Sequence, residues 1–555
     1  MEPTKLLVAI FTLLVLVAHS AAETHFLFWN VETTNITHNC FSANVTTVNG
    51  QIPGPTVEIN EGDTVVINVT NNANYEISIH WHGIFQFLTN WADGPAHITQ
   101  CPLNIGSSQI YEFTVTGQSG TFFWHAHNNW LRATMYGHFI VHPAAAPPFG
   151  EVAAEYSIIS GEWFSQDPNV VELGFIDTLN PVENATVANT INGEPGPLYG
   201  CPADTQIFPV TSGSTYLLRL TNAGLNNDHF FKVANHTLTV VRADGNYLQP
   251  FDTDVVVITP GQTTDVLLTA NQPIGSYYGG VNVAEVPNVG APPPSTPALV
   301  IIQYEGSNST DSPVTPEFPS MFNLMPVDNY TSFLKGLEPY SLPETVDVEL
   351  VYVAGIASVN CNASEPCTTK IAGTIQNSTF DDPQNTSVLE AYYNNIPGVF
   401  TTDVPDLPPV FEDFTSQPDR NYILGNRGTR TRVLQFNDVV QLVLQNVNAF
   451  GILDHPFHLH GHDFYVVGRN YTNFNPDVDP AGFNLVDPPK FNTISIPNGG
   501  WVALRFQANN PGVWLLHCHF ERHKTWGMEM AFITENGSGA NETLPGPLHP
   551  PPSCT

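Results

Sequence analysis

The chain has 555 residues, of which 42% are hydrophobic and only 12% are charged. At about 150 residues per domain, this length predicts several domains, and the apolar content excludes a disordered or fibrous chain despite 47 prolines and 41 glycines. The net charge of −35 would repel the phosphates of a nucleic acid, so we expect no nucleic-acid partner.

Residues 1–22 have the pattern of a secretory signal peptide. Lys5 supplies a positive charge, residues 6–18 form an uncharged apolar core, and Ser20-Ala21-Ala22 places small residues at the cleavage positions. The apolar core is too short to span a bilayer, and a buried N-terminal helix is the alternative. We therefore expect a soluble extracellular protein that begins near Glu23 and has no membrane partner.

Asn-X-Ser/Thr sequons support the same compartment, because so many of them together are typical of a secreted glycoprotein. They lie at Asn35, Asn44, Asn68, Asn184, Asn235, Asn308, Asn329, Asn362, Asn377, Asn385, Asn470, Asn536 and Asn541.

A faint internal repeat runs along the chain. Asn49–Pro55 forms a turn before the alternating apolar segment Glu61–Val69, and Asn192–Pro197 precedes a similar segment, Ser212–Leu220. Phe436–Leu444 repeats the strand pattern a third time. Helical patterns are weak, while β-branched and aromatic runs alternate with Gly, Pro and Asn turns, so we expect an all-β chain of three similar sandwich or barrel domains.

Pro-rich and Ser-rich breaks give the expected boundaries. The resulting division is a signal peptide at 1–22, a first domain at 23–145, a second at 155–305, a linker at 306–343 and a third domain at 344–555.

Ten of the 20 histidines fall in four short clusters. Residues i and i+2 of a strand point to the same face, so each His-X-His can present two imidazoles to one metal site. For a single cluster, a polar pair on an exposed strand is the alternative, but four clusters in repeated contexts indicate metal binding. The clusters are His80-Trp81-His82, His125-Ala126-His127, His455-Pro456-Phe457-His458-Leu459-His460, and His517-Cys518-His519 followed by His523.

The repeat relates these clusters to one another. His80 and His82 match His458 and His460, and His125 and His127 match His517 and His519, whereas the corresponding stretch of the second domain, residues 274–280, has no such ligand. Eight histidines from two related domains predict a metal cluster where the first and third domains meet.

A second metal site is expected in the third domain alone. Cys518, His455, His523 and Met528 stand where the first domain has Ala126, Ile77, Leu131 and Tyr136. A thiolate, two imidazoles and a thioether are the ligands of a blue-copper electron-transfer centre. Zinc is disfavoured because Met is a poor zinc ligand, and core packing is the alternative role for Met528.

Cys518 also links the two sites, because its neighbours His517 and His519 can face the histidine cluster and give an electron a short route through bonds. This wiring is that of an oxidase that collects four electrons and reduces O₂ to water. Seven cysteines in an oxidising compartment leave one unpaired. With Cys518 assigned to metal, six cysteines remain for three disulfides, whose connectivity the residues alone leave open.

These motifs resemble those of the multicopper oxidases, and the surrounding sequence resembles the plant-type laccases over nearly the whole mature chain. The carrying segments are 80–83, 91–95, 98–102, 124–127 with 130–134, 161–163, 234–241 and 455–461. The resemblance implies three consecutive cupredoxin-like domains, Greek-key β-sandwiches or barrels, and four copper ions.

The resemblance also implies a ligand set. The type 1 copper would be held by His455, Cys518 and His523 with Met528 axial, and the type 2 copper by His80 and His458. One type 3 copper would be held by His82, His125 and His519, and the other by His127, His460 and His517.

Further implications concern acids and disulfides. Asp93 and Glu521 match acids that supply protons to the reducing oxygen, although Asp93 could merely form a turn with Gly94-Pro95 and Glu521 could pair with Arg522. By similarity, Cys101 would pair with Cys554 and Cys40 with Cys201, which leaves Cys361 for Cys367.

The function expected from this resemblance is that of a secreted apoplastic laccase, a monomer that oxidises phenols such as monolignols or flavonoids by one electron and reduces O₂. Ascorbate oxidase or another low-potential multicopper oxidase is the closest alternative, and its usual sequence near the second histidine cluster differs from Trp130–Thr134. A non-catalytic copper-binding protein of the cell wall fits less well, because every ligand position is filled.

Overall fold

The computed structural model describes residues 22–554 apart from 39, 177–185, 201–204, 285–293, 309–311, 321–322, 324, 362–368, 409–410, 412, 416–424 and 448–453. Most of the expected signal peptide, the sequons at Asn184 and Asn362, and the cysteines Cys201 and Cys367 lie outside the described residues.

The N-terminal part of the chain forms two four-stranded sheets, in the orders β2-β1-β4-β6 and β3-β8-β7-β5. Alternation along β4 buries Val65, Ile67 and Val69 between the sheets, where they join Trp81 and Trp124 in one core. The strands are β1 (Thr24–His38), β2 (Phe41–Val48), β3 (Val57–Asn60), β4 (Thr64–Asn72), β5 (Ile79–His82), β6 (Ser108–Thr114), β7 (Gly120–Ala126) and β8 (Tyr136–His142).

The middle part forms a six-stranded sheet, β10-β9-β12-β17-β14-β15, and a five-stranded sheet, β11-β19-β18-β13-β16. Its elements are β9 (Glu155–Phe164), α1 (Pro168–Ile176), β10 (Thr186–Ile191), β11 (Ile207–Val210), β12 (Thr215–Asn222), β13 (His229–Val233), β14 (Leu238–Ala243), β15 (Asn246–Thr253), β16 (Val256–Ile258), β17 (Thr263–Thr269), β18 (Ser276–Val283) and β19 (Ala298–Tyr304).

The C-terminal part forms an eight-stranded sheet, β23-β22-β21-β20-β25-β30-β27-β28, and a five-stranded sheet, β24-β32-β31-β26-β29. Its elements are β20 (Val348–Asn360), β21 (Thr369–Ile375), β22 (Ser378–Thr379), α3 (Val388–Tyr393), β23 (Asn426–Arg427), β24 (Thr431–Leu434), β25 (Val439–Val447), β26 (His455–Leu459), β27 (Phe464–Asn470), β28 (Lys490–Phe491), β29 (Thr493–Ile496), β30 (Trp501–Gln507), β31 (Gly512–Cys518), α4 (Glu521–Thr525) and β32 (Glu529–Thr534).

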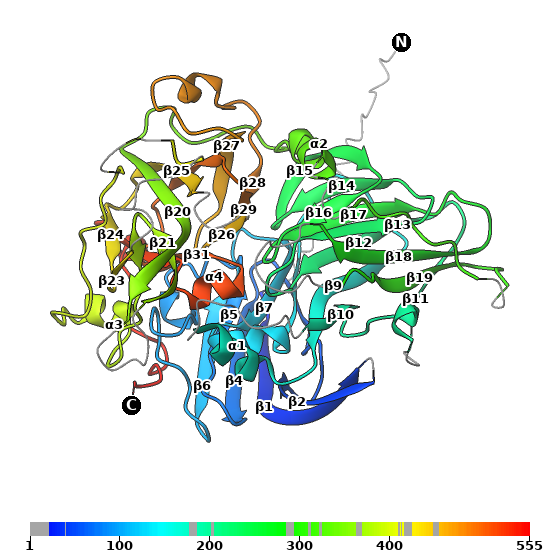
Figure 1. The fold of residues 1–555 in the computed structure, drawn as a ribbon, viewed down its shortest axis with the longest axis horizontal. Helices are drawn as coiled ribbons and strands as arrows, with labels where there is room; N and C mark the ends of the chain where they lie inside the picture. The colour runs from blue at the N-terminus through cyan, green and yellow to red at the C-terminus, as the bar shows by residue number, and fades with distance from the viewer. Residues whose placement is uncertain are drawn as a thin grey trace, which may run out of the picture.

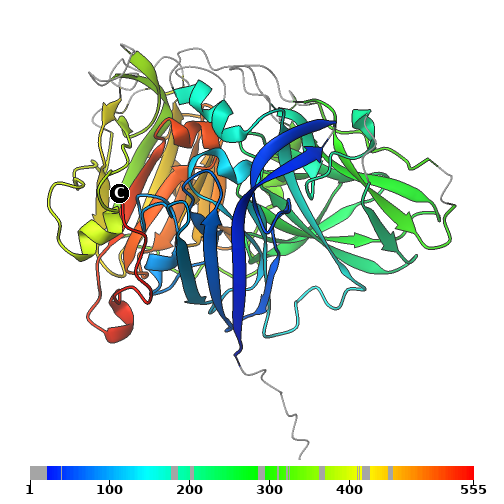
Figure 2. The ribbon, with the colours of Figure 1, turned by 90° about the horizontal axis from the view of Figure 1, so that it is seen from below.

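These six sheets confirm the expected all-β chain of three cupredoxin-like domains. The strands of the first domain, blue to cyan, lie between the green second domain and the yellow-to-red third domain (Figures 1 and 2). One hydrophobic core contains residues of both the second and the third domain, including Phe231 and Phe457, so these two domains also pack against each other. The three domains therefore meet pairwise around the centre of the molecule.

The segment between the second and third domains, predicted as a linker, includes an α-helix. It contains α2 (Met325–Phe333), whose Tyr330 is buried and packs against Phe251 of β15. The sequence of this segment shows no helical pattern, because the short helix packs through one buried aromatic side chain rather than through a long apolar stripe. No described helix of the chain is long and apolar enough to cross a membrane.

Disulfides join distant parts of the chain. Cys101 and Cys554 are bonded, with Cα atoms 5.1 Å apart, as the resemblance implied. Cys40 and Cys361 are disulfide-bonded too, and the partners expected for them lie outside the described residues. Among the described cysteines, Cys518 is the free one, and it is buried.

Candidate metal centre

Eight buried histidines converge where the first domain meets the third. They come from the ends of four strands: β5 and β7 of the first domain, and β26 and β31 of the third. Within each of three groups, the potential ligand atoms all lie within 4.8 Å of one another. The groups are His80 with His82 and His458, His82 with His125 and His519, and His127 with His460 and His517.

Hydrogen bonds fix which nitrogen of each ring faces the cluster. The Nδ1 of His80 lies 2.9 Å from the carbonyl oxygen of Asp93, and the Nδ1 of His458 lies 2.9 Å from that of Asn492. A carbonyl can only accept, so both Nδ1 atoms carry the proton and both Nε2 atoms keep a free lone pair. These two Nε2 atoms and that of His460 are buried without a hydrogen-bond partner among the described residues.

His82 is oriented the other way round. Its Nε2 lies 2.9 Å from Thr493 Oγ1, whereas its Nδ1 faces the Nε2 of His125 at 3.4 Å. His127 and His517 likewise present their Nε2 atoms to each other at 3.4 Å. Nitrogens this close and without protons between them are arranged to share a cation rather than to bond to each other.

The protonation states agree with that arrangement. Burial, followed by the neighbouring imidazoles and nearby cations, lowers the pKa of His82, His125 and His519 well below 6.5, and it lowers the pKa of His460 to about 4. Neutral imidazoles are the form that binds metals. A buried cluster of neutral rings with unpartnered lone pairs fits metal ions and would be costly without them.

A second group lies in the third domain and contains His455, Cys518 and His523. The Cys518 Sγ is 3.4 Å from His523 Nδ1 and 3.9 Å from His455 Nδ1, and these two nitrogens are 3.0 Å apart. Burial raises the pKa of the Cys518 thiol well above 9.0, so a thiolate there needs a bound cation to stabilise it. The donor set and its closeness fit a copper ion of the blue type.

Met528 is fully buried and tied to this group through its backbone. Its carbonyl accepts the N–H of Cys518 at 3.0 Å, and its own N–H donates to the carbonyl of His523 at 3.0 Å. The backbone of β21 packs closely on it, since a Cβ on Gly373 would lie 2.6 Å from the Cβ of Met528. The backbone of Met528 is therefore held in place by hydrogen bonds to Cys518 and His523.

Cys518 lies in sequence between histidines of two different groups. Its neighbour His517 belongs to the group of His127 and His460, and its other neighbour His519 belongs to the group of His82 and His125. The covalent path from the thiol to either group is a short stretch of backbone plus one imidazole.

Asp93 is both a turn residue and a partner of the histidines. It follows a short 3-10 helix (Asn90–Ala92), and Gly94 after it has a φ of +97°. Its Oδ2 accepts a hydrogen bond from His460 Nδ1 at 2.9 Å. Burial opposes ionisation of Asp93, but His460 and His80 outweigh it and hold the pKa of the carboxyl well below its usual range.

Glu521 lies at the other side of the cluster, at the start of α4. Its Oε2 is 3.0 Å from the Nε of Arg132 and its Oε1 is 4.0 Å from the Nζ of Lys524. Arg132 is itself buried, and it donates from Nη2 to the carbonyl of His519 at 2.8 Å. Glu521 is thus connected to a histidine of the cluster through one arginine.

Two contributions were absent from the expectations. Arg132 stands in the Trp130–Thr134 motif, but no local signal places it on His519, which is 387 residues away in sequence. The segment Asn492–Thr493, which holds His458 and His82, carries no motif either. Both roles depend on contacts between domains rather than on sequence spacing.

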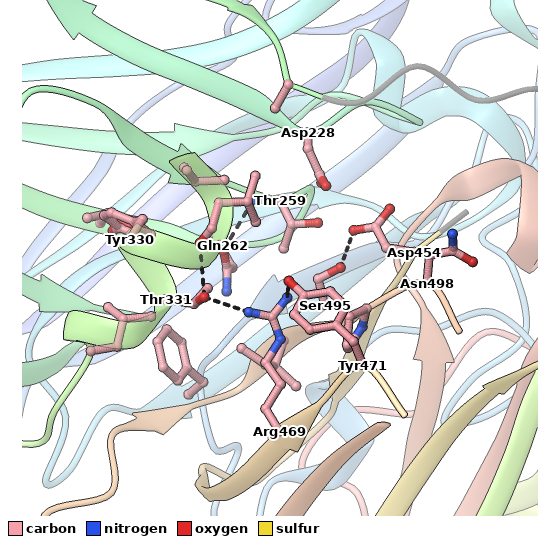
Figure 3. A pocket seen from close by; sticks show the side chains of 18 residues that line it. Asp228, Thr259, Gln262, Tyr330, Thr331, Asp454, Arg469, Tyr471, Ser495 and Asn498 are labelled. Carbon is pink, nitrogen blue, oxygen red and sulfur yellow. Dashed lines mark hydrogen bonds between the residues drawn. The ribbon is translucent and has the colours of Figure 1, made fainter. Parts of the chain in front are cut away.

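A pocket opens next to the second group, between the second domain, α2 and the third domain (Figure 3). Asp454, the residue before His455, reaches its wall and accepts a hydrogen bond from Ser495. Asp228 of the second domain faces Asp454, and burial together with that carboxylate raises the pKa of Asp228 well above 3.8. Arg469 enters from the opposite side and donates to Thr331 Oγ1 at 2.6 Å. The pocket combines apolar walls with polar groups close to a copper-ligand candidate.

Family models identified as multicopper oxidase match residues 30–146, 154–307 and 401–538. The chain is 43% identical over 541 residues to Laccase-12 of Arabidopsis thaliana, with 94% of each chain covered. It is 43% identical over 555 residues to Laccase-3 of Oryza sativa subsp. japonica, with 97% of each covered.

Solved structures agree with the family models. The laccase from Botrytis aclada superposes with a TM-score of 0.73 at 25% identity and covers 95% of this chain and 90% of its own. Fet3p, described as a multicopper oxidase that functions in iron import, superposes with a TM-score of 0.74 at 25% identity, over 94% of this chain and 93% of its own. The chain therefore belongs to the multicopper oxidase family and is an enzyme of the plant laccase type.

Proposed function

We propose that this enzyme is a secreted laccase that oxidises phenols by one electron and reduces O₂ to water with four copper ions. The observation that carries the proposal is the arrangement of Cys518 between two histidines that belong to different groups of the buried cluster. When bound, the coppers supply one-electron oxidation at the first site and four-electron reduction of O₂ at the cluster.

The groups of close ligand atoms support the following ligand assignment. His455, Cys518 and His523 would hold the type 1 copper, with Met528 as a further ligand, and His80 and His458 would hold the type 2 copper through the Nε2 atoms that lack other partners among the described residues. The type 3 pair takes His82, His125 and His519 for one ion, and His127, His460 and His517 for the other.

Two acids on opposite sides of the cluster deliver protons in this proposal. Asp93 orients His460 and His80, and its ionised carboxylate can pass a proton on without storing it. Glu521 does the same on the side of His519, where Arg132 keeps its carboxylate in place. Two contacts support this role: Asp93 accepts a hydrogen bond from His460, and Glu521 pairs with Arg132, which in turn donates to His519.

The phenol binds in the pocket beside His455. The apolar side chains Val257, Phe491 and Ile494 of its lining suit an aromatic ring, and the paired carboxyls of Asp228 and Asp454 can accept the phenolic proton as the electron leaves. A monolignol or a flavonoid matches such a site, which offers apolar contact to the ring and polar groups for its hydroxyl groups.

The setting that we propose is the apoplast, with cleavage after Ala22, occupied sequons, and a monomeric state. The Cys101–Cys554 disulfide supports an oxidising compartment. The tests are oxygen uptake by the copper-loaded enzyme with coniferyl alcohol or with ascorbate, together with the Cys518→Ser variant. A laccase consumes oxygen with the phenol and loses this activity in the variant, whereas uptake with ascorbate alone would assign the chain to the ascorbate oxidases.

A further inference from the structure

The outer face of the β2-β1-β4-β6 sheet carries two large apolar side chains in solvent. Phe26 is 66% exposed and Phe28 is 74% exposed, both on the N-terminal half of β1. In Figure 2 this dark-blue strand runs down the front of the molecule with no other element in front of it. Exposed apolar patches of this kind mark contact sites in soluble proteins, so this face requires an occupant.

The strand register places one polar residue in the middle of this patch. Phe28 pairs with Asn68 of β4, and Asn68 pairs on its other side with Ile110 of β6. Register partners in a sheet point to the same face, and the burial of β4 alternates so that Val66, Asn68 and Thr70 face outward. Asn68 therefore lies between Phe28 and Ile110, with Val66 and Thr70 as its outward neighbours on β4.

The far side of this face is already partly covered. Glu112, which follows Ile110 on the same face of β6, lies 2.8 Å from His549 of the C-terminal segment. The uncovered part is the side of β1, where Phe28 lies directly beside Asn68 and Phe26 pairs with Val66.

Asn68-Val69-Thr70 is one of the sequons of the chain. We propose that the N-glycan of Asn68 folds back over Phe28 and Phe26 and is the permanent cover of this apolar face. The proposal rests on the secretion assigned above, because only a secreted chain receives the glycan. It goes beyond that assignment by giving one glycan a structural contact.

The chemistry of both partners supports this occupant. The faces of pyranose rings carry C–H groups that pack on the negative face of a phenyl ring, and their hydroxyl groups remain in water. The glycan is tethered within one strand spacing of Phe28, so little freedom is lost when it settles on the ring. A bulky sugar at the centre of the patch also blocks a flat protein surface from docking there.

The test is a double-mutant cycle on the secreted, copper-loaded enzyme. Asn68→Gln removes the glycan, Phe28→Thr removes the ring while keeping strand propensity, and the two are combined. Thr70→Ala removes the same sequon without changing Asn68 and serves as a second glycan-free form. Asn541→Gln removes an exposed sequon in the C-terminal segment and is the matched control.

We expect peptide mass spectrometry to find Asn68 glycosylated in the wild type. Asn68→Gln and Thr70→Ala should each lower the unfolding temperature by about 2–4 °C and increase binding of an apolar dye. In the Phe28→Thr background the loss of the glycan should cost clearly less, and Asn541→Gln should change neither quantity.

Three results would overturn the inference. If Asn541 carries a glycan and Asn68 does not, the inference that a glycan covers this face fails, while the proposed secretion still stands. An occupied Asn68 whose effect adds independently to that of Phe28→Thr shows that the sugar does not touch the ring. A protein without a glycan at any of its sequons would contradict the secretion and the cover together.

Discussion

Asp244 connects the second domain to the histidine cluster and gives the sharpest test of how that cluster is held. It is buried in the turn between β14 and β15, and its Oδ1 accepts the N–H of Thr263, the first residue of β17, at 2.9 Å. Its Oδ2 accepts the N–H groups of Asn492 and Thr493 at 3.1 and 3.0 Å. The second domain thus clamps the segment of the third domain that orients His458.

The magnitude of Asp244→Asn follows from these three bonds. In the better orientation the amide oxygen keeps both bonds to the third domain, and its NH₂ group then faces the N–H of Thr263. The N–H of Thr263 and the new NH₂ group then both lack an acceptor, and each unsatisfied donor costs about 1–3 kcal/mol of the free energy of unfolding. Asp244→Ala leaves all three donors unsatisfied and should cost about 3 kcal/mol or more.

The pH dependence of this loss has a definite sign. Burial raises the pKa of Asp244 from 3.8 to about 7, although the three N–H donors act in the opposite direction. The folded chain then holds a proton that the unfolded chain releases near pH 4, so the contribution of Asp244 to stability falls as the pH rises from about 4 to about 7. The difference between wild type and Asp244→Asn should therefore be larger at pH 5 than at pH 8.

The assay combines urea unfolding at the two pH values with the electron paramagnetic resonance spectrum of the type 2 copper. Removing an outer partner of a metal-bound histidine costs about 10–100-fold in affinity, and we expect the lower end because Asp244 acts through the backbone of Asn492–Thr493. The matched control is Asp265→Asn, since Asp265 is equally buried and holds Arg219 and Thr121. An unchanged type 2 spectrum in Asp244→Asn, or the same change in Asp265→Asn, would refute this reasoning.

Other predictions address the remaining parts of the molecule. Met528→Leu conserves volume and should lower the free energy of unfolding by less than about 1.5 kcal/mol. Potentiometric titration should show a higher type 1 reduction potential in this variant, because the thioether no longer favours oxidised copper. An equal or lower potential would mean that Met528 does not bind the copper. Cys554→Ser opens the bridge to Cys101 and should lower stability by about 2–5 kcal/mol in thermal unfolding. Burial lowers the pKa of His229 to about 4, so stability present above pH 6.5 should decline as the pH falls toward 4, and His229→Gln should flatten that decline in calorimetry.

The sequence predicted the metal centre well wherever geometry is local. The two-residue period of a strand put His80 and His82 on one face, and the structure places both in one group. The same reasoning placed His517 and His519 on either side of Cys518, and they fall in two groups of the cluster. Periodicity along β4 and its counterparts likewise predicted the all-β class.

The contacts that hold the histidine cluster from outside join residues that are far apart in sequence, so no local pattern predicts them. Asp244 is 249 residues from Thr493, and its Asp-Gly sequence is that of an ordinary turn. The sequence suggested the neighbouring Arg522 as a partner for Glu521. The structure pairs Glu521 with Arg132 of the first domain, a contact between domains that no local pattern indicates. Helix α2 was missed because a single buried aromatic anchors it.

The most direct test of the account counts copper ions and follows the blue absorption in wild type and in Cys518→Ser. We expect four coppers per chain and an intense thiolate-to-copper band in the wild type. The variant should lose the band, its phenol oxidation and one copper, and keep the other three, because serine offers no soft thiolate. A colourless wild type with full copper occupancy, or a variant that keeps the band, would contradict the assignment of Cys518 as the link between the two sites.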